Sequence, residues 1–309
     1  MTNKPFATPI LFLIFNRPDT TKKVFEIIRE IKPKKLFISA DGPRLDKKGE
    51  QQRCEEARNI VKNIDWKCDL KTNLSKKNLG CRVSVSSGIN WFFNHVSEGI
   101  ILEDDCLPDK SFFHFCKTLL EYYRNDERVM HIGGFNYQDA IIRGTGSYYF
   151  SRLSHVWGWA TWKRAWEKYD VNICTYPLLL KQKLLSSVFS DPIMERYLKR
   201  NIELVYKNNK DTWDIQWQYA VSINNGLTII PNVNLVSNIG FDLNATHTID
   251  DFHTLANRPI SSIEKIRHPI FIVPDYCADR YTIRKYDNPN KWKKMWQLIR
   301  RKYSYVTTK

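Results

Sequence analysis

Predicted strands and helices alternate regularly over the first hundred residues. Residues 9–15 (PILFLIF) form a short, continuous apolar run, which is typical of a strand buried on both faces. Further strands are predicted at residues 35–40, 67–74 and 99–102. Segments with apolar residues at helical spacing separate them, beginning at residue 18, near residue 54 and at residue 82. This alternation predicts an α/β fold with a mostly parallel central sheet and right-handed crossovers.

The second half of the chain is less regular. Its predicted elements are a helix near residues 111–123, a strand near 129–132, an aromatic segment at 157–166, a helix near 191–207, and strands near 228–230 and 235–237. The clearest boundary is the Asp-Asn-Pro-Asn stretch that begins at Asp287. We therefore expect one domain over residues 1–286, divided into halves near residue 108, followed by a tail at residues 287–309.

Polar motifs follow three of the predicted strands directly. Because ligands bind at the carboxyl ends of parallel strands, these motifs are expected to converge on one site. They are Asn16-Arg17, Asp41-Gly42 and Glu103-Asp104-Asp105.

The charge of the chain predicts an anionic partner. The net charge is +15, and from Arg284 to Lys309 there are nine lysines or arginines but a single acid, Asp287. Such a balance fits nucleic acid, an anionic membrane surface or a phosphate-bearing substrate. Residues 291–303 place Trp292, Trp296 and other apolar residues on one helical face, which predicts a basic amphipathic helix at a membrane surface. The alternative is a helix packed on its own domain.

Cysteine usage and hydropathy indicate the compartment. The seven cysteines are odd in number and lack C-x-x-C spacing, so neither a disulfide framework nor a zinc ribbon is expected. The early apolar run is too short for a signal peptide, and no stretch is long and apolar enough to span a bilayer. We expect a cytoplasmic protein, attached peripherally at the inner face of the cell membrane.

The three adjacent carboxylates of Glu103-Asp104-Asp105 point to a cation. They repel one another unless a positive charge lies nearby, and hard oxygen ligands suit Mg²⁺ or Mn²⁺. Such a metal would neutralise the charge that grows on a diphosphate leaving group. The alternative is a solvated acidic turn.

These motifs together resemble the GT-A glycosyltransferases, most closely the Golgi N-acetylglucosaminyltransferase family of N-glycan processing, and also bacterial sugar transferases of surface-polysaccharide synthesis. The resemblance extends over roughly residues 9–245. It implies a Rossmann-like nucleotide-diphospho-sugar transferase fold, with a nucleotide-binding half at 1–108 and an acceptor half at 109–286. It also implies that Asp105 binds the metal and that the following residues bind the nucleotide sugar: Asn16, Arg17, Asp41, Asn78, Gly80, Arg82, Glu103 and Asp104.

The acceptor half carries the remaining parts of the resemblance. Trp157, Gly158 and Trp159 resemble an aromatic segment that binds the acceptor, although the spacing of the tryptophans also fits core packing. Trp213-Asp214 resembles the stretch that holds the catalytic base, which leaves the base as Asp214 or, in another register, Asp211. Asp214 would otherwise be a buried helix cap, and Asp41 an ordinary turn residue. His247 is a candidate second metal ligand.

The predicted activity is a metal-dependent transfer of a hexosyl or N-acetylhexosaminyl group, with inversion, in surface polysaccharide synthesis. The donor is expected to be a nucleoside diphosphate sugar, which the resemblance implies to be a UDP-sugar, and the acceptor a glycan or lipid-linked glycan. One alternative is a non-catalytic nucleic-acid-binding protein, suggested by charge and aromatic content, although no zinc finger or RNP motif is present. Another is a nucleotidyltransferase, which normally carries a glycine-rich basic N-terminal loop where this chain has FNRPDTT.

Overall fold

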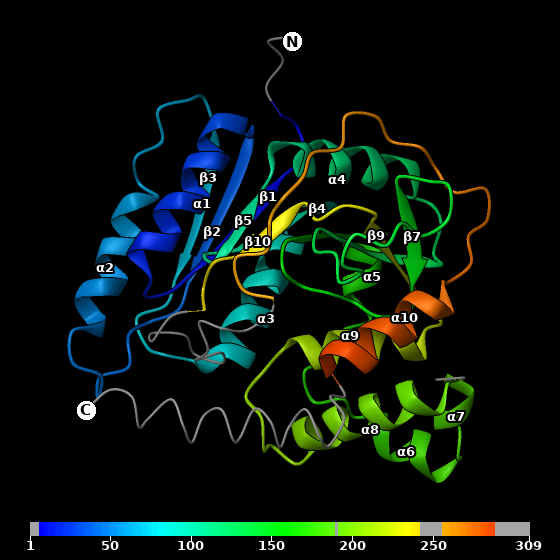
Figure 1. Ribbon diagram of the computed structural model, residues 1–309. Helices are drawn as coiled ribbons and strands as arrows, with labels where there is room; N and C mark the ends of the chain where they lie inside the picture. The colour runs from blue at the N-terminus through cyan, green and yellow to red at the C-terminus, as the bar shows by residue number, and fades with distance from the viewer. Residues whose placement is uncertain (1–5, 189–190, 242–254, 288–309) are drawn as a thin grey trace, which may run out of the picture.

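An eight-stranded sheet forms the centre of the molecule in the computed structural model, which describes residues 6–188, 191–241 and 255–287. The strand order is β3-β2-β1-β4-β8-β6-β9-β7, from left to right in Figure 1. Strands β7 and β8 run opposite to the other six, so the expected α/β fold with a mostly parallel sheet is confirmed. The strands are β1 (Ile10–Ile14), β2 (Lys35–Ala40), β3 (Asp69–Leu74), β4 (Glu98–Glu103), β6 (Val129–Gly133), β7 (Tyr148–Ser151), β8 (Trp159–Trp162) and β9 (Leu227–Pro231). A separate two-stranded sheet pairs β5 (Cys106–Pro108) with β10 (Val236–Asn238).

Successive residues of the central strands enter two different cores. Ile10 and Phe12 of β1 pack in one cluster and Leu11 in the other, because side chains alternate between the faces of a sheet. Both faces are covered by helices, which explains why β1 is apolar at every position.

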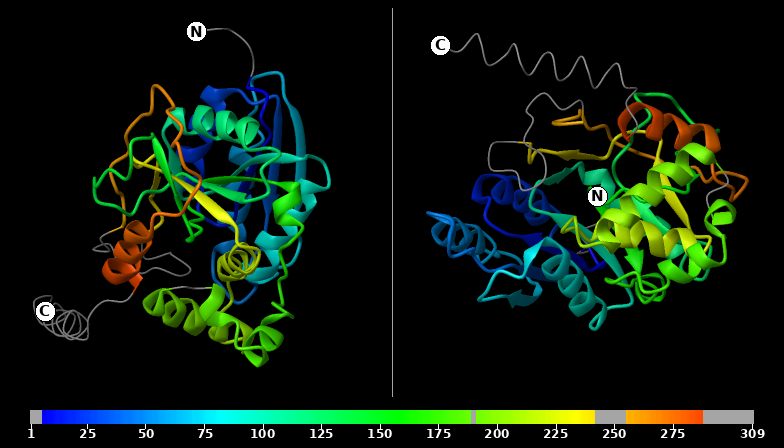
Figure 2. Two further views of the ribbon diagram at one scale, coloured as in Figure 1. Left: turned by 90° about the vertical axis from the view of Figure 1, so that its right-hand side faces the viewer. Right: turned by 90° about the horizontal axis from the view of Figure 1, so that it is seen from below.

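Helices from both halves of the chain cover the two faces. Helices α1 (Pro18–Ile31) and α4 (Lys110–Tyr122) pack on one face, and α3 (Gly80–Phe93), α5 (Lys163–Trp166) and α9 (Asp214–Ile223) on the other. Below the sheet, α8 (Pro192–Tyr206) lies beneath α9 (Figure 2, left), and both contribute to a third apolar cluster. The other helices are α2 (Glu50–Ile60), α6 (Tyr176–Lys181), α7 (Leu185–Val188), α10 (Tyr276–Thr282) and the π-helix η1 (Ile283–Asp287).

The aromatic segment at 157–166 forms a strand followed by a short helix. Its centre is the strand β8, which lies antiparallel between β4 and β6 and joins the two halves of the chain. Trp159 and Trp162 are 0% and 2% exposed, because a central strand is covered on both faces.

Membrane-related predictions are tested only in part. None of the helices in the described part of the chain combines the length and apolar character that crossing a bilayer requires. The predicted amphipathic tail helix lies outside the described residues. All seven cysteines are free, in agreement with the predicted absence of a disulfide framework.

A buried histidine connects α9 to the segment that follows β7. The Trp217 indole N–H of α9 lies 3.0 Å from His131 Nδ1, and His131 Nε2 lies 2.9 Å from the carbonyl oxygen of His155. Since the indole can only donate, Nδ1 accepts and Nε2–H donates, so the ring is neutral. Burial lowers the pKa of His131 from 6.5 to about 3.

We expect His131 to make folding sensitive to acid. The unfolded chain protonates this histidine below pH 6.5 while the folded chain does so only near pH 3, so its contribution is complete above pH 6.5 and is lost as the pH falls towards 3. At pH 5 the loss is about 2 kcal/mol. In His131→Gln, the free energy of unfolding by urea should fall by about that much less between pH 7 and 5 than in the parent protein. An unchanged pH dependence would contradict this.

Candidate functional site

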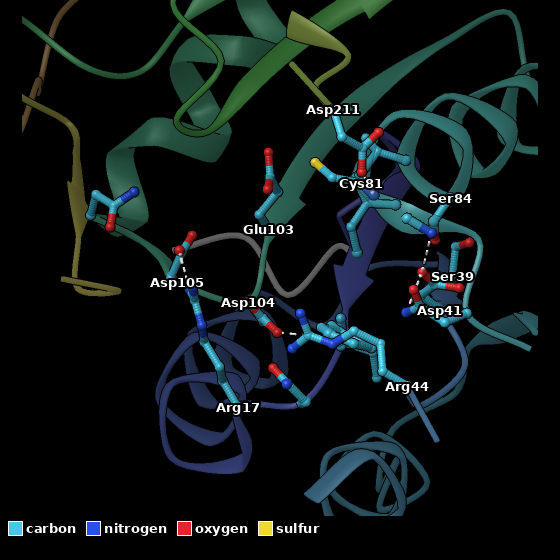
Figure 3. A pocket seen from close by; sticks show the side chains of 18 of the residues that line it. Arg17, Ser39, Asp41, Arg44, Cys81, Ser84, Glu103, Asp104, Asp105 and Asp211 are labelled. Carbon is cyan, nitrogen blue, oxygen red and sulfur yellow. Dashed lines mark hydrogen bonds and ion pairs between the residues drawn. The ribbon is translucent and has the colours of Figure 1, made fainter. Parts of the chain in front are cut away.

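A cavity of about 350 Å³ opens at the carboxyl ends of β1, β2 and β4. The polar motifs of these three strand ends line it together, as the βαβ pattern predicts (Figure 3). In Figure 3, Arg17 and Arg44 lie on one side of the 103–105 carboxylates, and Cys81 and Asp211 on the other. Of the predicted site residues, the lining includes Asn16, Arg17, Asp41, Asn78, Gly80, Glu103, Asp104, Asp105, Trp157 and the alternative base Asp211.

The three carboxylates that end β4 differ in their surroundings. Asp104 is buried and accepts a hydrogen bond from the Phe15 amide at 2.9 Å. Burial, together with the charge of Asp105, raises the pKa of Asp104 to about 7. Burial and the charges of both aspartates raise the pKa of Glu103 as well. Asp105 forms an ion pair with the Arg17 guanidinium.

The donor set fits a divalent cation that shares its coordination with a substrate. Within the described ranges, no three His, Cys, Asp or Glu side chains are grouped so that they could hold a metal by themselves. Magnesium-type sites are commonly built from one or two carboxylates and the phosphate oxygens of a substrate. Asp105 and Glu103 supply such carboxylates. Burial and the charges of Asp105 and Asp104 raise the pKa of Glu103, and Asp105 is paired with Arg17, so a cation here would relieve excess negative charge. His247 lies outside the described residues.

A second arginine, Arg44, lines the cavity and is held in place by the buried carboxylate of Glu50. Glu50, which is 0% exposed, accepts hydrogen bonds from the Arg44 guanidinium and from Asn16 Nδ2 at 2.8 Å. Burial opposes ionisation of Glu50, but these bonds outweigh it and lower its pKa. Arg44 also lies over the Phe15 ring. Neither Arg44 nor Glu50 is among the residues predicted from the sequence; the available signal is the position of Arg44 shortly after the strand-end Asp41.

Asp41 organises the loop that precedes α3. Its buried carboxylate accepts hydrogen bonds from the amides of Leu79 and Gly80 and from Asn78 Nδ2, at 2.9 to 3.2 Å. Burial is the largest influence on this carboxyl and raises its pKa. Asp41 is therefore more than a local turn residue, because it fixes Asn78 and Gly80 at the edge of the cavity.

Asp211 joins the two halves of the chain at the start of α3. Its carboxylate accepts the amide N–H groups of Cys81 and Arg82 at 3.0 and 3.1 Å, which satisfies two otherwise unpaired donors of the helix. Gly80, at φ +79°, allows this approach, because a side chain there would meet the Asp211 carboxylate. The Arg82 side chain bonds to Asn208 and to the Lys210 carbonyl, and it does not line the cavity.

A smaller cavity of about 190 Å³ adjoins the first one. Trp157 lines both cavities, and Asp214 lines the second. Asp214 is the first residue of α9, is half-buried, and accepts a hydrogen bond from the Thr212 hydroxyl. Its charge also acts on Glu103 in the first cavity. The two candidate bases thus face different cavities.

The other two residues of the predicted acceptor segment lie elsewhere. Trp159 is fully buried and stacks on His131 and Trp213, so its side chain cannot touch an acceptor. Gly158, at φ +64°, packs against Val236 and lines neither cavity. Both are explained by packing at the entry to β8, which the sequence pattern does not distinguish from ligand contact.

Comparisons with known proteins leave the family of this chain open. No family model matches the sequence, and no match was found among curated proteins. Among solved structures, an apo UDP-glucose pyrophosphorylase is similar at 10% identity, with 72% of this chain and 90% of that chain covered and a TM-score of 0.36. A UDP-glucose pyrophosphorylase complexed with UDP-glucose is similar at 13% identity, with 52% and 70% covered and a TM-score of 0.30.

A third similar structure is a cytidylyltransferase from Leptospira borgpetersenii, at 11% identity, with 64% of this chain and 74% of that chain covered and a TM-score of 0.32. These likenesses are too distant to carry an argument about the chemistry of this chain. The solved structures named here are two pyrophosphorylases and a cytidylyltransferase, and the resemblance of this chain to N-acetylglucosaminyltransferases stays a prediction from motifs.

Replacing Asp41 should affect folding as well as binding. Asp41→Ala leaves the amides of Leu79 and Gly80 without their partner, so the free energy of unfolding should fall by about 1–3 kcal/mol. Affinity for UDP, measured by calorimetry, should fall too, because the loop edge of the cavity loses its support. Asp69→Ala, at an exposed position on the neighbouring strand β3, is the control and should change neither quantity. Unchanged stability and affinity in Asp41→Ala would contradict this assignment.

Proposed function

We propose that this protein is a glycosyltransferase that moves a sugar from a nucleoside diphosphate donor to a hydroxyl group of an acceptor. The observation that carries the proposal is the pair of adjoining cavities that share Trp157. One is ionic, with clustered carboxylates and two arginines, and the other is aromatic with a single carboxylate, Asp214. A donor diphosphate needs charged groups and an acceptor sugar needs an apolar ring surface, and the two ligands must lie next to each other to react.

Arg17 and Arg44 are assigned to the phosphate end of the donor. Both line the first cavity, and guanidinium groups bind phosphate oxygens in a bidentate manner. A divalent cation at Asp105 and Glu103 would supply further neutralisation of the diphosphate as it leaves. Arg17 now pairs with Asp105, so donor binding would require it to exchange this partner for a phosphate oxygen.

Asp214 is assigned as the general base. It accepts the proton of the acceptor hydroxyl while the acceptor oxygen bonds to the anomeric carbon. The bond from that carbon to the phosphate oxygen breaks, and its electron pair leaves with the nucleoside diphosphate. Attack from the side opposite the leaving group inverts the anomeric configuration. Asp211 is a poorer candidate, because both of its carboxylate oxygens already bind amides of α3.

Nucleotidyl transfer is the second candidate, since carboxylates that hold a divalent cation serve that reaction equally. The connection between β1 and α1 speaks against it. This connection is only Phe15-Asn16-Arg17, without glycine, whereas nucleotidyltransferases normally carry a glycine-rich basic loop there.

The two candidate bases can be separated by a matched pair of variants. Asp214→Asn keeps the shape of the side chain and removes its basicity, so kcat should fall by about 10²–10⁴ with UDP affinity near that of the parent protein. Asp211→Asn should instead lower the melting temperature, because the cap of α3 is weakened, and retain most of kcat. If Asp211→Asn is inactive and Asp214→Asn is active, the assignment is reversed.

The metal and the reaction type can be tested by product analysis. With a panel of nucleotide sugars and Mn²⁺, we expect nucleoside diphosphate to be released, and EDTA to abolish release reversibly. Asp105→Asn should lower both activity and Mn²⁺ binding in the presence of UDP, measured by electron paramagnetic resonance. Formation of nucleoside triphosphate when pyrophosphate is added would favour nucleotidyl transfer, and full activity in EDTA would exclude the metal.

A further inference from the structure

The second cavity differs sharply in charge from the chain that contains it. The chain carries a net charge of +15, yet no lysine or arginine is among the described residues that line this cavity. Among the described lining residues, the one carboxylate is that of Asp214. An anionic ligand would therefore meet a carboxylate and no lysine or arginine from the described lining.

The remaining polar groups of the cavity are neutral. Burial, together with the nearby His131, lowers the pKa of the His155 ring to about 3, so this ring is uncharged at neutral pH. Gln218 is held by hydrogen bonds from Ser154 to its oxygen and from its own NH₂ group to Arg152 and Ser222. Asn201 of α8 also lines this cavity, and its NH₂ group donates a hydrogen bond to the Tyr197 carbonyl. These side chains therefore add no charge to the cavity, and Asp214 remains the charged group among the described lining residues.

Two aromatic rings supply an apolar surface in the same cavity. The rings of Tyr137 and Trp157 are roughly parallel, with centroids 6.1 Å apart and an angle of 29° between their planes. Trp157 is held edge-on by Phe135 and Phe241, at centroid distances of 4.7 and 5.7 Å. A rigid, flat ring of this kind can lie against the apolar face of a pyranose.

We infer that the second cavity selects a neutral pyranose as the acceptor and rejects uronic acids and sugar phosphates. This inference rests on the proposed function. It adds that the acceptor carries no negative charge. This follows because the described residues that line the cavity include the Asp214 carboxylate but no lysine or arginine. A sugar phosphate, the substrate of a nucleotidyltransferase, is disfavoured for the same reason.

The test compares sugars that differ only in one carboxylate. Methyl glucoside and methyl glucuronoside, and the corresponding galactose pair, are titrated into the full chain with UDP and Mn²⁺ present and followed by ligand-observed NMR. We expect the neutral member of each pair to bind at least about tenfold more tightly. Equal or tighter binding of the acidic member overturns the inference, and so does failure of both neutral sugars to bind.

A lysine introduced among the lining residues of the second cavity tests whether the sugar binds there. Asn201→Lys places a cation on α8, so affinity for the glucuronoside should rise and the preference should shrink or reverse. Asn201→Gln is the neutral control and should keep the preference of the parent protein. UDP affinity, which reports on the first cavity, confirms folding of both variants. If Asn201→Lys leaves both sugar affinities unchanged, the sugar does not bind here and the inference fails.

Failure of this inference can be told apart from failure of the proposed function. Transfer from a nucleotide sugar to acidic acceptors only would keep the glycosyltransferase and overturn the neutral acceptor. Binding of neutral sugars without turnover of any donor would keep the preference for a neutral sugar and overturn the glycosyltransferase.

Discussion

Mutual repulsion among the three carboxylates that end β4 is the constraint on which the site depends. Asp104 is buried and held by a backbone amide, Glu103 has a raised pKa, and Asp105 contacts Arg17. This arrangement concentrates negative charge where two arginines and two further strand ends converge. Under the proposed function, a cation and a phosphate would bind here together, because the cation would offset the carboxylates and the arginines would offset the phosphate.

The sheet order brings the second half of the chain against this charge. Strand β8 pairs with β4 and β6, and α9 packs on the same face as α3. At this junction, Asp211 caps the start of α3, and Asp214 lines the second cavity. Two acids only three positions apart thereby serve different purposes: one closes the helix, and the other faces space that a ligand can enter.

Much of the first half could be predicted from sequence, because its elements are locally encoded. The second strand was expected at residues 35–40 and is found there, since an apolar run between turn residues fixes its ends. The convergence of Asn16, Asp41 and Glu103 also follows from βαβ topology alone. In the second half, the tryptophans of 157–166 were ambiguous. Their spacing fits a helix, a strand or a ligand surface, and only neighbours distant in the sequence determine that Trp159 is core and that Trp157 lines a cavity.

The sequence by itself determined the α/β class, the strand ends that carry polar residues, and the acidic cluster, because each depends on residues close together along the chain. Tertiary structure alone decided which side chains contact one another. Glu50 reaches Asn16, Arg17 reaches Asp105, and Asp41 holds a loop nearly forty positions away. It also decided that a strongly basic chain contains a cavity whose described lining has no cation. Composition counts charges, whereas a binding site depends on which of them the fold brings within a few ångströms of one another.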